Sequence, residues 1–312
     1  MSTVPAAPTY KSGKKSVAPT ATAASDAARA AALQFLSQLA VELSSSDNVN
    51  LPCFPNVVIR IRDALANPKT TPTQAVIIAG AEPRLAARLL QIANSAAFNH
   101  SHKPLTDLRA AITRLGHQVV QSAAMAFAVQ HMKNEQSLQS IAKSLSELWM
   151  ESIAVASICQ SVASRTKVSP DEAFLTGLLH GIGRLYVMVR AVGKLDGMDN
   201  ESFTDLVLGW QASIGKSVLE NWGFAEEMCE AVGDQGDRAG LRKRTGKHEA
   251  DLADILIAGI VLSEALRMDA PRVVEMEGIT AFSMIGLSAE DCSAILSHTE
   301  KKLGSLQSAL GC

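Results

Sequence analysis

Apolar residues recur at intervals of three and four along most of the chain, which is the period of an α-helix that buries one face. Ala32, Leu36, Leu39 and Leu43 form the first such stripe, within 26–43. The same period predicts further helices over 57–65, 83–92, 106–116, 119–132, 138–163, 170–179, 206–222, 225–232, 252–268 and 289–306. Alternation at period two is nearly absent, so we expect an all-α bundle of about a dozen helices with little or no sheet.

Several helix starts are marked by capping residues. Ser169 is followed by proline at N1 and by Glu172 at N3, which is a capping box. Glu82-Pro83 is expected to open a second helix, Thr106 to cap a third and Ser288 to cap the last. Gly116 is expected to end the helix that Thr106 begins.

Composition narrows the class of protein. The chain has 312 residues, of which 47% are hydrophobic and only 4% aromatic, so small aliphatic side chains must fill the interior. A net charge of −2 argues against a general nucleic-acid binder, which needs a surplus of Lys and Arg. The five cysteines show no paired spacing, which is typical of reduced thiols. With neither an apolar run of about 18 residues nor a signal peptide, we expect a cytoplasmic protein that does not bind membranes.

The most informative segment is 173–185, with the sequence AFLTGLLHGIGRL. It places His180 at the end of an apolar helix, and Gly181, Ile182, Gly183 and a basic residue follow. We interpret the two glycines as a helix end and a tight turn, where glycine avoids the steric penalty of left-handed backbone. By itself, His180 is explained as a buried helix-end histidine, and a ligand-binding role is the alternative.

This segment resembles the GLLHDIGKL signature of the HD superfamily of metal-dependent phosphohydrolases, in which the His and the next Asp hold a divalent metal. Gly181 stands at the Asp position. Further segments are similar to those of the HDOD family, the HD-related output domain of bacterial signalling proteins, and follow the family's order. They are LPCFP at 51–55, AEPRLAARLLQIANSA at 81–96, AITRLG at 111–116, LWMES at 148–152 and NWGF at 221–224.

The resemblance implies an all-helical fold in which most metal ligands are missing. Glu151 occupies the position of the first His, Asp234 lies where later His residues occur, and Glu264 lies near the position of a late Asp. A catalytic divalent ion needs three or more protein ligands, and of the family's ligands only His180 remains. We therefore expect no catalytic residue, no bound metal and no cofactor, and a vestigial pocket made of Glu151, His180, Asp234 and Glu264.

The expected organisation has four parts. Residues 1–25, rich in Ala, Pro, Ser, Thr and Lys, predict a disordered tail. An N-terminal helical subdomain of the HDOD-like region is expected over 26–137, an HD-like helical subdomain over 138–245, and a helical extension packed on it over 246–312.

The resemblance favours a non-catalytic signalling module that binds protein partners in a bacterial pathway. Two alternatives remain: a sensor of a nucleotide or cyclic-dinucleotide second messenger, and a metal-dependent phosphohydrolase with a reorganised site. The polar loop 233–248 is either a solvated connection or an electrostatic contact for a partner. Asn94 and Ser95 either hydrogen-bond a neighbouring loop or face a partner. The candidate partner- or ligand-binding residues are therefore Asn94, Ser95, Arg242, Lys243 and Arg244.

Overall fold

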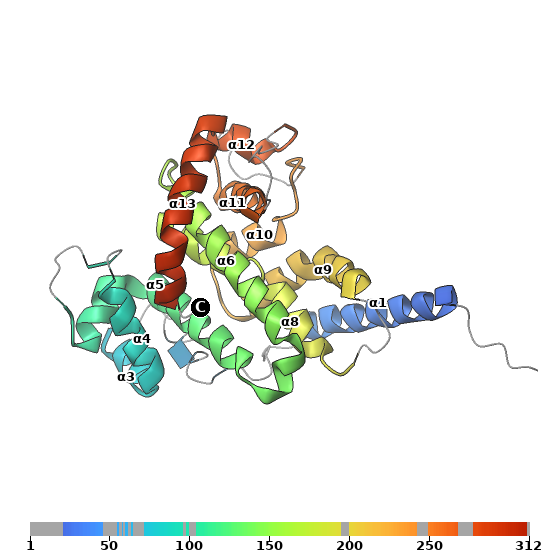
Figure 1. The fold of residues 1–312 in the computed structure, drawn as a ribbon, viewed down its shortest axis with the longest axis horizontal. Coiled ribbons are helices and arrows are strands. Elements are labelled where there is room, and N and C mark those ends of the chain that lie inside the picture. The colour runs from blue at the N-terminus through green and yellow to red at the C-terminus, as the bar shows by residue number, and fades with distance from the viewer. Residues whose placement is uncertain are drawn as a thin grey trace, which may run out of the picture.

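A computed structural model describes residues 21–45, 55, 58, 60–61, 64, 72–95, 98–99, 104–194, 200–241, 249–267 and 277–310 (Figure 1). Within these residues there are twelve α-helices, one 3₁₀ helix and no strand, which confirms the all-α prediction. None of the described helices is both long enough and apolar enough to span a bilayer.

The helices follow one another with mostly short connections. In chain order they are α1 (Ala21–Ser45), α3 (Pro72–Gly80), α4 (Pro83–Ala93), α5 (Leu108–Lys133), the 3₁₀ helix η1 (Gln136–Ile141), α6 (Ala142–Ala163), α7 (Pro170–Leu179), α8 (Ile182–Ala191), α9 (Asn200–Asn221), α10 (Glu226–Gly233), α11 (Leu252–Arg267), α12 (Thr280–Ile285) and α13 (Ala289–Leu310).

The predicted caps are confirmed at three helix starts. The Ser169 hydroxyl accepts a hydrogen bond from the Glu172 amide at 3.4 Å, and the Glu82 carboxylate caps α4. At α13, the Asp291 amide donates to the Ser288 hydroxyl at 3.1 Å, and Asp291 accepts from the Ser288 amide in return. These caps satisfy amides that the first helical turn leaves without an intrahelical acceptor.

The cap predicted at Thr106 is wrong by one residue. Asp107 is the N-cap of α5, and its carboxylate accepts a hydrogen bond from the Ala110 amide at 2.8 Å. The break at Gly116 is confirmed, because this glycine has φ +72° and interrupts the helical geometry of α5. A residue with a side chain would be strained in that conformation.

Other boundaries differ from the sequence prediction. The helix predicted over 138–163 begins instead as the tighter η1, and α6 starts at Ala142. Helix α1 begins at Ala21, inside the predicted tail, while residues 1–20 and 242–248 lie outside the described residues. Most of 57–65 also lies outside them. The predicted subdomain boundary at 137 falls within η1, and the one at 245 is not among the described residues.

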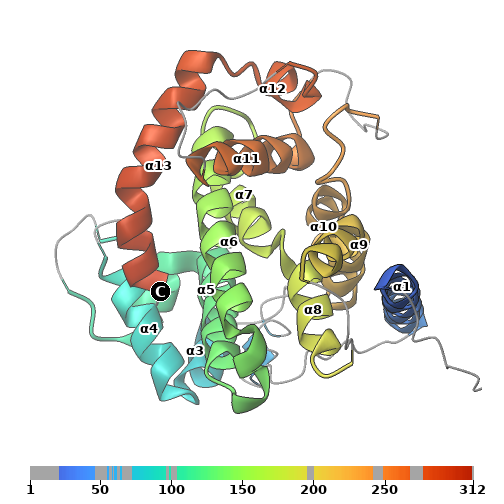
Figure 2. The ribbon, with the colours of Figure 1, turned by 45° about the vertical axis from the view of Figure 1, so that its right-hand side comes forward.

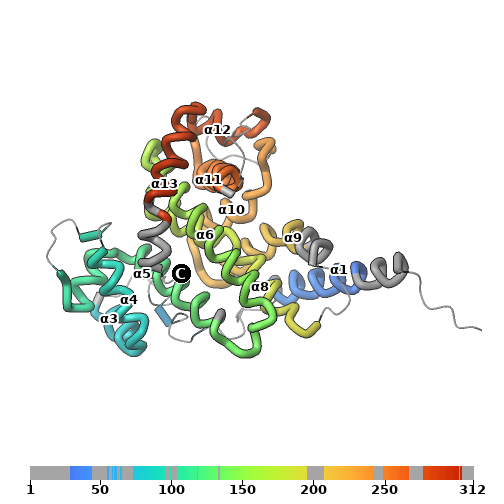
Figure 3. Tube along the Cα trace, viewed as in Figure 1, coloured from blue at the N-terminus to red at the C-terminus, as the bar shows by residue number. Residues whose placement is uncertain are grey.

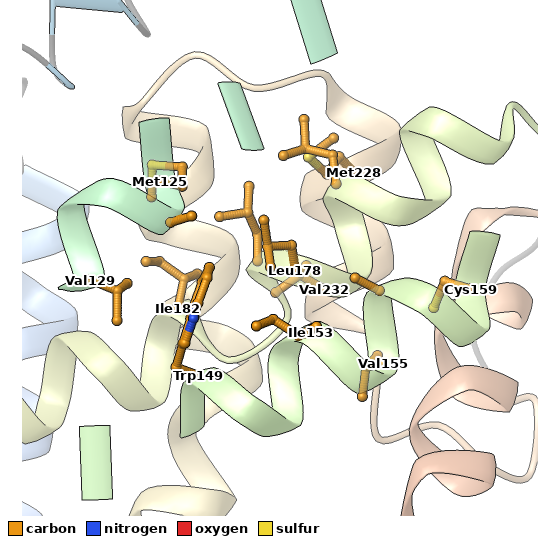
Figure 4. Packing of buried hydrophobic residues seen from close by; sticks show 14 of the residues in the cluster. Met125, Val129, Trp149, Ile153, Val155, Cys159, Leu178, Ile182, Met228 and Val232 are labelled. Atoms are coloured by element: carbon orange, nitrogen blue, oxygen red, sulfur yellow. The ribbon is translucent and has the colours of Figure 1, made fainter. Parts of the chain in front are cut away.

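Helix α6 lies at the centre of the bundle. It packs on α7, α11 and α13, and α13 also reaches α4 and α5 (Figure 2). Figure 3 shows the path of the chain around this centre. Buried side chains from α5, α6, α7, α8 and α10 meet there, among them Met125, Trp149, Leu178, Ile182 and Val232 (Figure 4). The core therefore surrounds the turn between α7 and α8, where the HD-like segment lies.

Candidate functional site

Three helices bring Glu151, His180 and Arg184 together. Glu151 lies in the middle of α6, His180 caps the C-terminal end of α7, and Arg184 lies in the first turn of α8. The Nε2 atom of His180 is 3.8 Å from Oε1 of Glu151, and Nη2 of Arg184 is 2.6 Å from its Oε2. We call these three residues the Glu–His–Arg cluster.

His180 lies between the end of α7 and the middle of α6. The residue is only 3% exposed, and its Nδ1 atom lies 2.7 Å from the Gly177 carbonyl oxygen. Because a carbonyl oxygen can only accept, Nδ1 carries the hydrogen and donates it. The Nε2 atom of His180 faces Glu151 at 3.8 Å, so the imidazole fills the space between the end of α7 and α6.

Glu151 is a charged group balanced by its neighbours. Burial by itself raises the pKa of Glu151, but contact with His180 and the positive charge of Arg184 outweigh that effect and lower the pKa well below its ordinary value. The carboxylate is therefore ionised at neutral pH. Arg184 supplies the compensating positive charge, and sequence reasoning gave this residue no role. The feature of the sequence that could have indicated a role for Arg184 is its position four residues after His180.

The two glycines of the segment lie in close contacts between helices, which corrects the prediction of a left-handed turn. Gly181 has φ −85°, and Gly183 lies within α8. A Cβ atom at Gly181 would lie 2.6 Å from Cδ1 of Leu148, and one at Gly183 would lie 2.0 Å from the backbone oxygen of Gln211. Gly181 thus lets the turn approach α6, and Gly183 lets α8 approach α9.

Gln235 supports the cluster from the turn that follows α10, and sequence reasoning did not single it out. It is 6% exposed, and its Nε2 donates to the carbonyl oxygens of His180 at 3.2 Å and Val232 at 2.9 Å. The side chain therefore joins the C-terminal ends of α7 and α10. Its Oε1 atom is buried and finds no hydrogen-bond partner within the described part of the chain. The feature of the sequence that could have indicated Gln235 is its place in 231–235, the stretch compared with the later His positions of the resembled HD signature.

The other two residues of the predicted vestigial pocket make different interactions. Glu264 forms an ion pair with Arg238 at 2.7 Å on the surface, and Asp234 is the C-cap of α10, where its backbone amide donates to the Glu230 carbonyl oxygen at 2.8 Å. Across the described ranges, no group of three His, Cys, Asp or Glu side chains could hold a metal ion. The cluster offers one imidazole and one carboxylate already engaged by Arg184, a donor set that does not fit a catalytic divalent ion.

Asn94 and Ser95 both hydrogen-bond within the protein. The Asn94 amide group donates to the Leu105 carbonyl oxygen at 2.7 Å and accepts from the Leu105 amide at 2.6 Å. The Ser95 hydroxyl donates to the Ile92 carbonyl oxygen at 2.7 Å. These bonds end α4 and fix the chain before α5, as one of the two interpretations predicted. The other three candidates, Arg242, Lys243 and Arg244, lie outside the described residues.

Comparison with known proteins gives the same fold. The family model of the HDOD domain matches residues 51–237. A solved structure of a candidate metal-dependent phosphohydrolase from Shewanella amazonensis is 24% identical, with a TM-score of 0.67 over 90% of this chain and 99% of its own. An HDOD domain protein of unknown function from Geobacter sulfurreducens is 19% identical, with a TM-score of 0.55 over 91% and 97%.

A candidate signal transduction protein from Marinobacter aquaeolei is 20% identical, with a TM-score of 0.58 over 91% of this chain and 66% of its own. At these identities the structural similarity establishes the fold alone. No curated protein matches the sequence.

Proposed function

Because this chain belongs to the HDOD-domain family, we propose that it is a non-catalytic regulatory module that acts by binding protein partners in a bacterial signalling pathway in the cytoplasm. The observation that carries the proposal is the 2.6 Å contact between Arg184 and Glu151. The Arg184 guanidinium group supplies the positive charge that balances the Glu151 carboxylate, which leaves this carboxylate already paired.

The chemistry of the cluster supports a structural role for it. Metal-assisted phosphoester hydrolysis needs an ion that activates a bound water, and a guanidinium group cannot do so because it stays protonated and has no open coordination position. His180 and Glu151 instead connect α6, α7 and α8 in the core. With its centre closed by these contacts, a helical bundle acts on other proteins through the outer faces of its helices.

Metal content and hydrolysis test the absence of catalysis. The protein is purified without added metal, its Mn, Fe, Ni and Zn are measured by mass spectrometry, and hydrolysis of bis-p-nitrophenyl phosphate and of cyclic dinucleotides is then assayed. We expect far less than one ion per chain and the same background rate for the wild type and His180→Ala. One equivalent of metal, with turnover that His180→Ala abolishes, would overturn the proposal.

Complementation tests the regulatory role in cells. The transcript profile of a strain that lacks the gene is compared with strains that carry the wild-type chain or Glu151→Gln, with circular dichroism used to confirm that the variant is folded. If the module acts through binding, the folded variant restores the wild-type profile. If a folded Glu151→Gln chain fails to restore the profile, the activity of the protein in the cell requires the Glu151 carboxylate itself, which would contradict the proposed role.

A further inference from the structure

Helix α1 covers part of the domain from outside it. It ends at Ser45, before the family region begins at residue 51. Its packing on the rest of the molecule runs along α9, and both views show it on the flank of the bundle beside that helix (Figures 1 and 2). The α9 surface below α1 is thus a face of the family domain that a separate helix covers.

The contact is that of an amphipathic helix on an apolar surface. Ala32, Leu36, Leu39 and Leu43 are all buried, at spacings of four, three and four residues. Val41, on the opposite side of the helix, is 66% exposed. The α9 surface therefore accepts one apolar stripe of a helix, which is how many domains recognise helical segments of other proteins.

Two basic residues border this surface, Arg190 in the last turn of α8 and Lys194 in the turn that follows. Nη2 of Arg190 is 2.6 Å from Oε2 of Glu42, and Nζ of Lys194 lies 5.7 Å from the centre of the Phe35 ring. The guanidinium carbon of Arg190 also lies 5.7 Å from the centre of the Tyr186 ring, which helps to orient the side chain. We call the α9 surface under α1, together with Arg190 and Lys194, the α1-binding face.

Helix α1 leaves one donor of this face unused. The Nε atom of Arg190 is buried, and no described residue accepts a hydrogen bond from it. Nε and Nη2 are the two donors on one side of a guanidinium group, and a carboxylate that faces this side accepts two parallel hydrogen bonds. Glu42 engages Nη2, so α1 does not use the full capacity of the face.

We propose that a helix of a partner protein replaces α1 on the α1-binding face. The partner helix repeats the apolar spacing of α1 and carries a carboxylate that accepts hydrogen bonds from both Nε and Nη2 of Arg190. Helix α1 is then an internal competitor that keeps the apolar face covered until the partner arrives. This inference rests on the proposed function, because it specifies the chemistry of the partner that the module binds.

A labelled peptide of residues 29–45 serves as the probe, with binding measured by fluorescence anisotropy against full-length chains. Affinity for the face scales with the fraction of chains in which the face is uncovered. We expect the full chain with Leu36→Asp and Leu39→Asp to bind the peptide about tenfold more tightly, or better, than the wild type. If that chain fails to fold, Glu42→Arg in the full chain weakens the polar contact alone and provides the same comparison.

Two variant peptides test which side chains of α1 the α1-binding face recognises. A peptide with Val41→Gln, on the exposed side, is expected to bind as the unchanged peptide does. A peptide with Glu42→Arg is expected to bind weakly to the Leu36→Asp, Leu39→Asp chain and to regain affinity when that chain also carries Arg190→Glu. Equal binding to covered and uncovered chains, no binding to either, or no regain by charge reversal would each overturn the inference.

Light scattering tests whether α1 of a second copy of the chain, and not a partner protein, occupies the α1-binding face. A wild-type dimer that Leu36→Asp and Leu39→Asp convert to a monomer would mean that a second copy exchanges α1, which would overturn the assignment to a partner helix. A wild-type monomer, together with peptide binding to the uncovered face, supports it. Failure of these binding tests leaves the metal and hydrolysis results unaffected, so the proposed absence of catalysis is judged separately.

Discussion

Replacing Glu151 by Gln removes a charge from the centre of the Glu–His–Arg cluster. The side chains of Glu151 and Arg184 are 14% and 18% exposed, so the pair lies between a buried and a surface ion pair. Losing one partner of a buried pair costs about 3–5 kcal/mol, whereas an exposed pair contributes about 0–1 kcal/mol. We therefore expect the free energy of unfolding to fall by about 2 kcal/mol at neutral pH.

The effect has a defined pH dependence. The pKa of Glu151 is lowered in the folded protein from its ordinary 4.5, so ionisation of this group favours folding. A group with a depressed folded-state pKa contributes fully above its unfolded-state pKa, and the contribution is lost as the pH falls through the folded-state value. The stability difference between wild type and Glu151→Gln should be largest at neutral pH and shrink below pH 4.5.

Urea titrations followed by tryptophan fluorescence, at neutral pH and at about pH 3, measure both effects. Glu147→Gln is the matched control, because Glu147 and Lys143 in the same helix are 66% and 90% exposed and 3.8 Å apart. It should change stability by less than about 0.5 kcal/mol. A double-mutant cycle with Arg184→Gln should give a coupling energy of about 1 kcal/mol or more. A Glu151→Gln effect no larger than the control, or one independent of pH, would refute the reasoning.

Three further substitutions probe the framework around the cluster, each measured by urea titration. Gly183→Ala should destabilise the chain by at least about 3 kcal/mol, because its Cβ would lie 2.0 Å from the Gln211 backbone oxygen. Asn94→Ala should cost about 2 kcal/mol, because it removes two hydrogen bonds to the Leu105 backbone. Ser288→Ala should cost about 1 kcal/mol, because it removes a side-chain cap of α13.

Each of these has a control at a similar position. Gly209→Ala places a methyl group in α9 where no described atom lies within 4 Å, and it should stabilise the helix by up to about 1 kcal/mol. Ser95→Ala removes only one hydrogen bond, to the Ile92 carbonyl oxygen, and should cost less than Asn94→Ala, while Ser288→Thr should be nearly neutral. A Gly183→Ala chain as stable as wild type would contradict the close contact of α8 and α9. If Asn94→Ala or Ser288→Ala lowers the free energy of unfolding no more than its own control does, the hydrogen-bond explanation for that residue is contradicted.

The fold class and many helix ends could be predicted from the sequence because they depend on neighbours along the chain. The caps at Ser169 and Ser288 involve residues three positions away, and the break at Gly116 follows from the conformational freedom of one residue. Helix α8 as a whole was not predicted, because Gly181 and Gly183 have low intrinsic helix propensity and were interpreted as a helix end and a turn. In the folded chain Gly183 is required by the backbone of α9, a neighbour that local reasoning does not include.

The candidate site could be predicted only in part. Segment order located Glu151 and His180, and the structure places them 3.8 Å apart. Segment order did not indicate that Arg184 neutralises Glu151, because these residues are separated by 33 positions and meet only when α6, α7 and α8 pack. Segment order also did not indicate that Glu264 lies outside the predicted vestigial pocket, because its pairing with Arg238 depends on the path of the chain between α10 and α11.

The sequence by itself therefore determined an all-helical chain, because helical periodicity is a local property. It predicted an incomplete set of metal ligands from residue identity, which is also local. Only the tertiary structure decided which charges balance one another and which glycines are required by contact. It also decided that α1 covers an outer face of the domain. Those properties depend on distances between segments far apart in the chain, and packing alone sets these distances.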